Sequence, residues 1–529
     1  MFKTHRTQLN SDLFWLIFFT LAAIFLWLLA LGELPLRDWD EGYYATVSQD
    51  MFNHHQWLYP TYQGHPFWLK PPLLFWLIHL SYQWGGVNEW SSRLPSAIIT
   101  ALGVPLLYLI GRQLDSLEPA TERYRAIFSA SVYLTLLPVV RLGRLAMLDG
   151  MINTFLLIAI FCLLKGFKSS RWLVGVGVGL GLISLSKGVL VIALGAILLS
   201  FILWEKRFKL LLNPYLWLGL LIGFLPALIW YFLQIHHYGQ DFVKIHFFSQ
   251  SFDRLSTAVE GNTGPFWFYL IELLKYAIPW LFFFIPGCIL AVRSLSVSAT
   301  SRSQTWAKLA LVGSIGYLGI ISLMTTKLPW YIMPFYIFFA LITGNYLNHL
   351  KNSHLKYPSL LSYLLLLCTV IALGGWIYFT FVTQQISLIL IAGALALTFG
   401  SSTFYFFQHQ YRSILLLILG LYGTFCLLML SPLWNWELNE AFAVKPVAQL
   451  IKSQTPADTI IYSSMPYSRT SLDFYSDRQV LAVDEKAIQD LSRKSGYLLL
   501  DATSLAKIST QHYQNLGQSG EFILIKTHP

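Results

Sequence analysis

The apolar stretch "LFWLIFFTLAAIFLWLLAL" (residues 13–31) contains no charged residue and is long enough to cross a bilayer as one helix. The whole chain has the same character, because 55% of its 529 residues are hydrophobic and only 12% are charged. A soluble protein of this size would carry about 25% charged residues. Since the other apolar residues also fall in runs of about twenty, the sequence predicts an all-α polytopic membrane protein with about thirteen transmembrane helices.

The first apolar run and two later ones need separate interpretation. No small-residue cleavage site follows residues 13–31, so this run is expected to be a retained anchor. Residues 172–186 and 188–204 flank "SLSKG" (184–188) and fit either two separate spans or a re-entrant pair. The four cysteines all lie inside apolar runs, which leaves neither a disulfide framework nor a metal-ligand spacing.

The net charge of +10 would fit a nucleic-acid-binding protein, but the positions of the basic residues argue against that class. Most of them lie in short loops between apolar runs, where Lys and Arg set membrane topology. This bias predicts a cytoplasmic N-terminus. Three segments are then expected to face outward: residues 34–93, residues 236–269 and the tail after Pro432.

The outward segments are not uniformly polar. "PPLLFWLIHLSYQWGG" (71–86) is too short and too interrupted for a span, and it predicts an interfacial helix along the membrane. In the tail, four short apolar runs indicate strands that alternate with helical stretches such as "EKAIQDLSRK" (485–494). The chain is therefore expected to divide into a transmembrane domain over residues 1–432 and a small extracytoplasmic α/β domain over residues 433–529.

Three carboxylates crowd into "LRDWDEGYYATVSQDM" (36–51), directly after the first span. The apolar positions of this stretch recur on one helical face, so a short amphipathic helix is expected to start near Asp38. Asp38 and Glu41 have the spacing of a capping box, which would give both a structural role. Asp40 is left either as a solvated first-turn carboxylate or as a general base at the mouth of a membrane cavity.

Asp149, in "RLGRLAMLDGMINTF" (141–155), is the second acidic candidate. It lies at the outer start of the fourth predicted span, so it could simply cap that helix. The predicted topology also places it on the same side of the membrane as Asp40. Two carboxylates from distant loops on one side are what acid–base chemistry needs.

The positive-inside rule depletes the outer face of basic residues, so those that remain there call for a reason. Lys70, Arg254 and Lys327 stand on that face among aromatic or apolar neighbours. Each could be an interfacial residue that reaches toward lipid headgroups, or together they could bind a phosphate. Tyr331 could donate to the same phosphate or belong to an aromatic belt.

Other polar residues of this face leave their roles open. Arg141 and Arg144 could join the phosphate-binding group or flank a span, and Lys187 could contact phosphate or anchor at the interface. The histidines show no ligand spacing that would indicate a metal site.

The order of these motifs resembles one family of membrane glycosyltransferases. It consists of "DE…Y" after the first span, then "LKPPLLFWLIHLSYQWGGVNEWSSRLPSAI", "RLAMLDGMINTF", "PFWFYL…PW" and "TKLPWYIMPFYIFFAL". The ordered set is similar to the protein mannosyltransferases and bacterial lipid A aminoarabinose transferases, which share the GT-C fold. The resemblance covers roughly residues 30–350, and the tail agrees only in general architecture.

The resemblance implies an enzyme that takes a sugar from a polyprenyl-phosphate carrier and transfers it to an acceptor outside the cytoplasm. It implies an integral protein of a bacterial inner membrane, with a lipid or glycan acceptor. The family's motifs fall on Asp40 and Asp149 as catalytic residues. They fall on four donor-phosphate residues: Lys70, Arg254, Lys327 and Tyr331. Transfer by direct displacement would invert the anomeric centre.

The chain also departs from this family. The aminoarabinose transferases place a metal-binding Glu before the Lys-Pro-Pro lysine and a His three residues before the arginine. Leu69 and Ser251 stand at these places, so both a divalent metal site of that kind and an aminoarabinose substrate are in doubt. The alternatives are a protein O-mannosyltransferase-like enzyme and, in a different class, a transporter or lipid flippase, which would place its ionisable residues near the bilayer midplane.

Overall fold

The computed structural model describes residues 2–115, 123–252, 261–296, 304–352, 357–436, 443–508 and 513–528. The chain forms two compact units. Unit 1 consists of Met1–Ala30, Trp68–Leu73 and Ser96–Trp434, and unit 2 of Leu31–Phe67, Leu74–Pro95 and Asn435–Pro529. Unit 2 thus joins most of the predicted first outward segment with the C-terminal tail. The predicted domain boundary at residue 432 stays a prediction.

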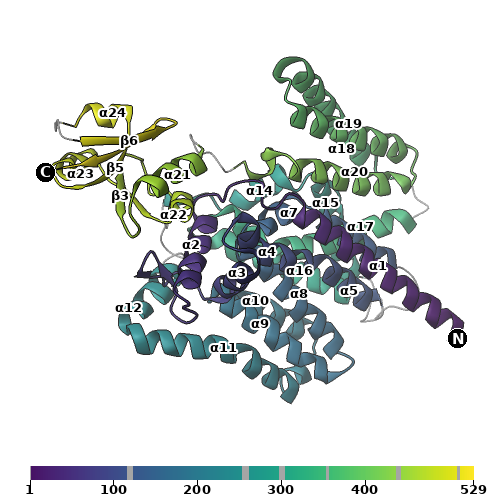
Figure 1. The fold of residues 1–529 in the computed structure, drawn as a ribbon. Helices are drawn as coiled ribbons and strands as arrows, with labels where there is room; N and C mark the ends of the chain where they lie inside the picture. Colours follow the sequence, from purple (N-terminus) through teal and green to yellow (C-terminus); the bar gives the residue numbers. More distant parts are fainter. Residues whose placement is uncertain are drawn as a thin grey trace. The chain divides into compact units, whose positions relative to one another are not determined.

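Unit 1 is built of helices (Figure 1). They are α1 (Phe2–Leu28), the C-terminal part of α4 (Glu89–Ala101), α5 (Gly103–Asp115), α6 (Arg123–Leu134), α7 (Leu137–Arg144), α8 (Asp149–Gly166), α9 (Leu173–Lys187), α10 (Leu190–Trp204), α11 (Pro214–Tyr238), α12 (Gln240–Val243), the π-helix η3 (Lys244–Phe252), α14 (Phe268–Tyr276), α15 (Trp280–Ser296), α16 (Thr305–Leu323), α17 (Phe335–Asn352), α18 (Ser359–Tyr378), α19 (Ile386–Phe407) and α20 (Arg412–Met429).

The membrane character of the chain is confirmed, whereas the count of about thirteen spans is not. Eight helices of the described residues are long and apolar enough to cross a membrane, or nine if the bent pair α6 and α7 is one span. α10 and α15 are apolar but shorter. The runs 172–186 and 188–204 form two helices, α9 and α10, and the chain breaks between them at Gly188, where φ is +47°.

Glycines allow an unusually close approach of α9 and α11. A Cβ on Gly177 would lie 2.0 Å from the carbonyl carbon of Gly219, and one on Gly181 would lie 2.0 Å from the carbonyl oxygen of Gly223. In an apolar solvent, helices associate through such backbone contact because hydrophobic burial gains nothing. The glycines of α9 therefore form a packing surface for α11.

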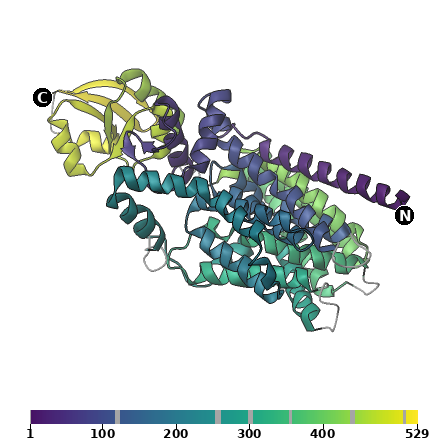
Figure 2. The ribbon, with the colours of Figure 1, turned by 90° about the horizontal axis from the view of Figure 1, so that it is seen from below.

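Unit 2 contains a helical part and a sheet (Figure 2). Its N-terminal segments form α2 (Asp40–Asn53), the hairpin β1 (Thr61–Tyr62) and β2 (His65–Pro66), and α3 (Leu73–Gly85). α2 confirms the helix expected near Asp38, and Tyr44, Val47 and Met51 are buried as the pattern predicts. α3 confirms the helix of residues 71–86, and its position along a membrane stays a prediction.

The tail of unit 2 forms a five-stranded sheet in the order β4-β3-β5-β7-β6. The strands are β3 (Ile460–Ser463), β4 (Gln479–Ala482), β5 (Gly496–Asp501), β6 (Tyr513–Ser519) and β7 (Phe522–Thr527). β3 is parallel to β4 and β5, and β7 is antiparallel to β5 and β6. The four predicted strands are confirmed, and β6, which is polar, was missed.

Helices cover both faces of this sheet. On one face, α21 (Val444–Gln454) and α22 (Thr470–Ser476) bury Val447, Ile451 and Leu472 against the strands. On the other, α23 (Glu485–Ser492) contributes Ile488, and α24 (Ala502–Ala506) packs its Leu505 nearby. A sheet with apolar residues on both faces requires both layers.

Candidate active site

The capping box expected from Asp38 and Glu41 is wrong. The N-cap of α2 is Trp39, with φ 66°, and no side chain caps this helix. The Asp38 carboxylate instead accepts hydrogen bonds from Arg469 Nε at 2.7 Å and from Ser471 N and Oγ at 2.9 and 2.6 Å. Asp38 therefore fastens the start of α2 to α22 within unit 2.

Glu41 is fully buried and ion-paired. Its carboxylate accepts from Arg93 Nε and Nη2 at 2.8 and 3.0 Å and from the backbone N–H of Arg37 at 2.9 Å. Burial alone would raise the pKa of Glu41, but the Arg93 guanidinium holds this pKa below its usual value. Arg93 also donates to the carbonyls of Leu31 and Leu34. The pair therefore fixes the chain that leads into α2.

Asp40 is the first residue of α2, and the surroundings of its carboxylate differ from those of Asp38 and Glu41. Its side chain is half-buried, and among the described residues no hydrogen bond or ion pair engages its carboxylate. Asp40 is thus an ionisable group held on a rigid helix and available to a ligand.

Asp149, Lys187 and Tyr331 form a second polar group, called the Lys187 cluster below. Lys187 Nζ lies 2.6 Å from Asp149 Oδ1 and 4.8 Å from the centroid of the Tyr331 ring. Asp149 is 5% exposed and begins α8, yet the N-cap of α8 is Leu148 and no side chain caps the helix. The cluster thus brings together the start of α8, the end of α9 and Tyr331, which are distant from one another in sequence.

Lys327 occupies a different environment from the one expected. Its ammonium donates to the carbonyl oxygens of Ile321 at 3.0 Å and Ser322 at 2.6 Å, and also to that of Met324. These contacts cap the C-terminus of α16, where a cation also offsets the negative end of the helix dipole. Lys327 could reach a phosphate only by giving up these acceptors.

Arg141 and Arg144 are structural. Arg144 is fully buried, donates to the carbonyls of Leu26 and Trp27 at the end of α1, and stacks its guanidinium 4.7 Å from the Trp434 ring. Arg141 donates to the Trp434 carbonyl at 2.8 Å. Of the alternatives left open for these arginines, the structure favours anchoring over phosphate binding.

Lys70 lies in the Trp68–Leu73 segment of unit 1 and is half-buried. The segment is attached to the helical unit through the Trp68 carbonyl, which lies 2.6 Å from Nδ1 of His246. Arg254 lies outside the described residues. The described part of the chain holds no group of three His, Cys, Asp or Glu side chains suited to a metal, and Leu69 offers no ligand atom.

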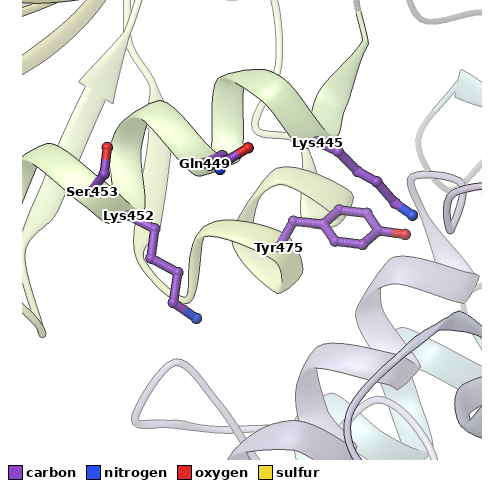
Figure 3. A pocket seen from close by; sticks show the side chains of 5 residues that line it. All are labelled: Lys445, Gln449, Lys452, Ser453 and Tyr475. Carbon is purple, nitrogen blue, oxygen red and sulfur yellow. The ribbon is translucent and has the colours of Figure 1, made fainter.

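A hollow of about 390 Å³ lies in unit 2 between α21 and α22 (Figure 3). Its lining includes Lys445, Lys452 and Tyr475. Lys445 pairs with Glu89, and Lys452 lies 4.0 Å from Asp477. Because each lysine faces a carboxylate, the hollow lacks the excess positive charge of an anion site.

Two relationships in unit 1 could not be read from the sequence. Asp149 and Lys187 are 38 residues apart, and nothing in the sequence indicates that they pair. His246 was set aside with the other histidines, since only the fold shows its contact with the segment that carries Lys70.

Two solved structures resemble the fold of this chain. The crystal structure of ArnT from Cupriavidus metallidurans bound to undecaprenyl phosphate matches 97% of this chain and 98% of its own, with a TM-score of 0.79 at 19% identity. The chain has the ArnT fold. An Archaeoglobus fulgidus oligosaccharyltransferase is similar over 93% of this chain and 69% of its own, with a TM-score of 0.52 at 12% identity.

Sequence relatives agree with the ArnT fold. Residues 69–231 match a family described as dolichyl-phosphate-mannose-protein mannosyltransferase. An undecaprenyl phosphate-alpha-4-amino-4-deoxy-L-arabinose arabinosyl transferase of Pseudomonas fluorescens is 28% identical over 58% of this chain and 54% of its own. One of Pseudomonas paraeruginosa is 30% identical with the same coverage. The chain thus spans about half the length of the curated relatives it matches, and the family resemblance of the motifs is confirmed.

Proposed function

We propose that this protein is an integral-membrane glycosyltransferase. It moves a sugar from a polyprenyl-phosphate carrier to a lipid or glycan acceptor on the extracytoplasmic face, with inversion at the anomeric carbon. The observation that carries the proposal is the ArnT fold over 97% of the chain, matched to a structure bound to undecaprenyl phosphate. Relatives named as undecaprenyl-phosphate aminoarabinose transferases support the same donor class.

The phosphate-binding role is proposed for residues of unit 1. As the bond to C1 of the sugar breaks, the leaving phosphate gains negative charge, which nearby cations stabilise by several kcal/mol. Lys187, Lys70 and Arg254 are proposed to supply that charge, and Tyr331 to donate from its hydroxyl. The three carbonyl contacts of Lys327 favour a helix-capping role over its predicted phosphate contact.

Asp40 is proposed to take the proton from the acceptor hydroxyl or to orient that hydroxyl. A general base must be ionised and unoccupied before the acceptor arrives. The Asp40 carboxylate is unoccupied among the described residues, whereas Asp38 and Glu41 are held by arginines. Asp149 is proposed to position Lys187 through their ion pair. The sequence predicted a catalytic role for Asp149, and this proposal limits that role to positioning Lys187.

The proposed orientation follows from charge. Basic residues gather in the short loops on the side of the N-terminus, so that side is proposed as cytoplasmic and the C-terminal unit as extracytoplasmic. The relatives are bacterial proteins, which supports an inner-membrane location. No step of the proposed reaction passes through a metal, because Leu69 replaces the ligand expected beside Lys70.

A protein O-mannosyltransferase-like activity is the second candidate, favoured by the family match over residues 69–231. Mass spectrometry of the products separates the two. Membranes that contain the protein, supplied with a polyprenyl-phosphate sugar, are expected to form a glycosylated lipid or glycan that is missing from membranes without it. A glycosylated protein would favour the second candidate. Solute transport without any glycosyl product would contradict both.

A further inference from the structure

The segment Trp68–Leu73 is a short excursion of the chain into unit 1. The residues before it, Leu31–Phe67, and after it, Leu74–Pro95, belong to unit 2. Between the end of β2 at Pro66 and the start of α3 at Leu73, the segment has no helix or strand of its own. Its place in unit 1 must therefore depend on contacts other than regular backbone hydrogen bonding.

His246 supplies one such contact. Its Nδ1 lies 2.6 Å from the carbonyl oxygen of Trp68, two residues before Lys70. Because a carbonyl only accepts hydrogen bonds, Nδ1 must carry a proton and donate. Burial lowers the pKa of His246 to about 4, so the imidazole is neutral near pH 7. A neutral ring protonated at Nδ1 leaves Nε2 as an acceptor, and the Tyr231 hydroxyl lies 3.4 Å from it.

The ring of His246 is held rigidly. It stacks on Phe242, with ring centroids 5.0 Å apart at 16°, and meets Trp230 and Tyr231 edge-on. The side chain is only 4% exposed. An imidazole fixed on several sides can set the position of the carbonyl to which it donates.

The same ring lies near Gly188, the residue that follows Lys187 in the chain. A Cβ placed on Gly188 would lie 3.1 Å from the Tyr231 hydroxyl and 3.7 Å from His246 Nε2. Gly188 directly follows Lys187, which is paired with Asp149. His246 therefore contacts the Lys70 segment on one side and lies near the break between α9 and α10 on the other.

We propose that His246 is a positioning residue that holds the Lys70 segment beside the Lys187 cluster, so that the two lysines serve one lipid-linked phosphate. This inference rests on the proposed function, because that function gives Lys70 its phosphate. The competing explanation is that His246 only fills an aromatic cluster. The two explanations differ in which property of the side chain matters, its N–H or its ring.

Two substitutions separate the N–H from the ring. His246→Phe keeps the aromatic packing and loses the donor to Trp68. His246→Asn loses the ring but keeps an N–H near the place of Nδ1. His236→Phe, at an exposed histidine of α11, is the matched control. The full chain in detergent is titrated with polyprenyl phosphate, and thermal unfolding is measured on the same samples.

The proposal expects His246→Phe to weaken polyprenyl-phosphate binding about tenfold, the worth of one hydrogen bond to a buried group. His246→Asn is expected to bind within about threefold of the unsubstituted protein although it unfolds at a lower temperature. If His246→Asn both unfolds at the lower temperature and binds more weakly than His246→Phe, the positioning role of His246 is overturned. The proposed function would not be affected by that result. A protein with no substitution that fails to bind polyprenyl phosphate would overturn the proposed function as well.

Discussion

Asp40 and Asp149 each begin a helix and were each expected to be catalytic, yet their surroundings differ. Asp40, at the start of α2, is half-buried, and its carboxylate engages no hydrogen bond or ion pair among the described residues. Asp149, at the start of α8, is 5% exposed and lies 2.6 Å from Lys187. One carboxylate is available to a ligand, and the other already neutralises a cation.

This difference distinguishes a general base from a residue that positions a lysine, whereas the sequence predicted a catalytic role for both aspartates. A carboxylate paired with a buried lysine is a poor proton acceptor, because protonating it would leave the lysine charge uncompensated. An unpaired carboxylate on a rigid helix can accept a proton or orient a hydroxyl. Asp40 is therefore the better candidate for the base, and Asp149 for holding Lys187.

The largest expected effect is that of Asp40→Asn on turnover. Loss of a general base lowers the rate of transfer by roughly 10²–10⁴-fold. The unfolding temperature should not change, because no hydrogen bond or ion pair among the described residues is lost. Steady-state transfer and thermal unfolding are measured together, with Glu33→Gln, an exposed carboxylate nearby in the chain, as control. Wild-type turnover by Asp40→Asn would remove the distinction between the two aspartates.

Glu41→Ala should lower the free energy of unfolding, whereas substitution of the adjacent Asp40 should not. Removing Glu41 leaves Arg93 buried without its partner, which costs about 4 kcal/mol in the free energy of unfolding. Thermal unfolding in detergent measures this, and Asp40→Ala is the matched comparison. Equal unfolding temperatures for the two variants would show that the Glu41–Arg93 pair does not hold the start of α2.

Asp149 and Lys187 should be coupled in a double-mutant cycle. Asp149→Asn or Lys187→Met alone leaves a largely buried charge without its partner, whereas the double variant leaves neither. The expected coupling free energy is about 2 kcal/mol from thermal unfolding. Additive effects would mean that the ion pair contributes little, and Asp149 would then again resemble Asp40.

Asp473 of α22 gives a third, smaller contrast, since it is buried and forms no ion pair with any residue that the structure describes. Burial raises the pKa of Asp473 to about 7. Hydrogen bonds from the Tyr62 hydroxyl and the Val480 N–H favour the charged form, but they do not offset the effect of burial. The folded state then keeps a proton that the unfolded chain, with a pKa of about 4, has released. Asp473 therefore stabilises the fold at low pH, and this contribution is lost as the pH rises through 7.

The stability lost through Asp473 between pH 6 and pH 7 should be roughly 1 kcal/mol. Asp473→Asn cannot ionise, so its free energy of unfolding should change less over this interval. Thermal unfolding at the two pH values gives the comparison, with Asp484→Asn as an exposed control. The same pH dependence in Asp473→Asn and in the unsubstituted protein would show that Asp473 stays charged.

Local patterns predicted what depends on local periodicity. The helix α2 and its buried face followed from the spacing of Tyr44, Val47 and Met51, and four of the five strands of the C-terminal sheet followed from short apolar runs. β6 was missed because its side chains are mostly exposed and polar, and its place depends on pairing with β7.

The partners of charged residues could not be predicted, because they are distant in the chain. Asp38 and Glu41 have the spacing of a cap, yet Arg469 and Arg93, 431 and 52 residues away, take these carboxylates instead. A buried ion pair with several hydrogen bonds outweighs a cap contact of about 1 kcal/mol. The Asp40 carboxylate has no hydrogen bond or ion pair among the described residues, and its role as the base stays a prediction. Asp38 and Glu41 are positioned by arginines and not by a capping box.

The most direct test is a single turnover by Asp40→Asn. The full-length variant is loaded with a labelled polyprenyl-phosphate sugar, mixed with acceptor, and sampled for transferred label. We expect the donor to bind as it does in the unsubstituted protein and its sugar to stay on the carrier. Transfer at the wild-type rate would contradict the assignment of Asp40 as the base.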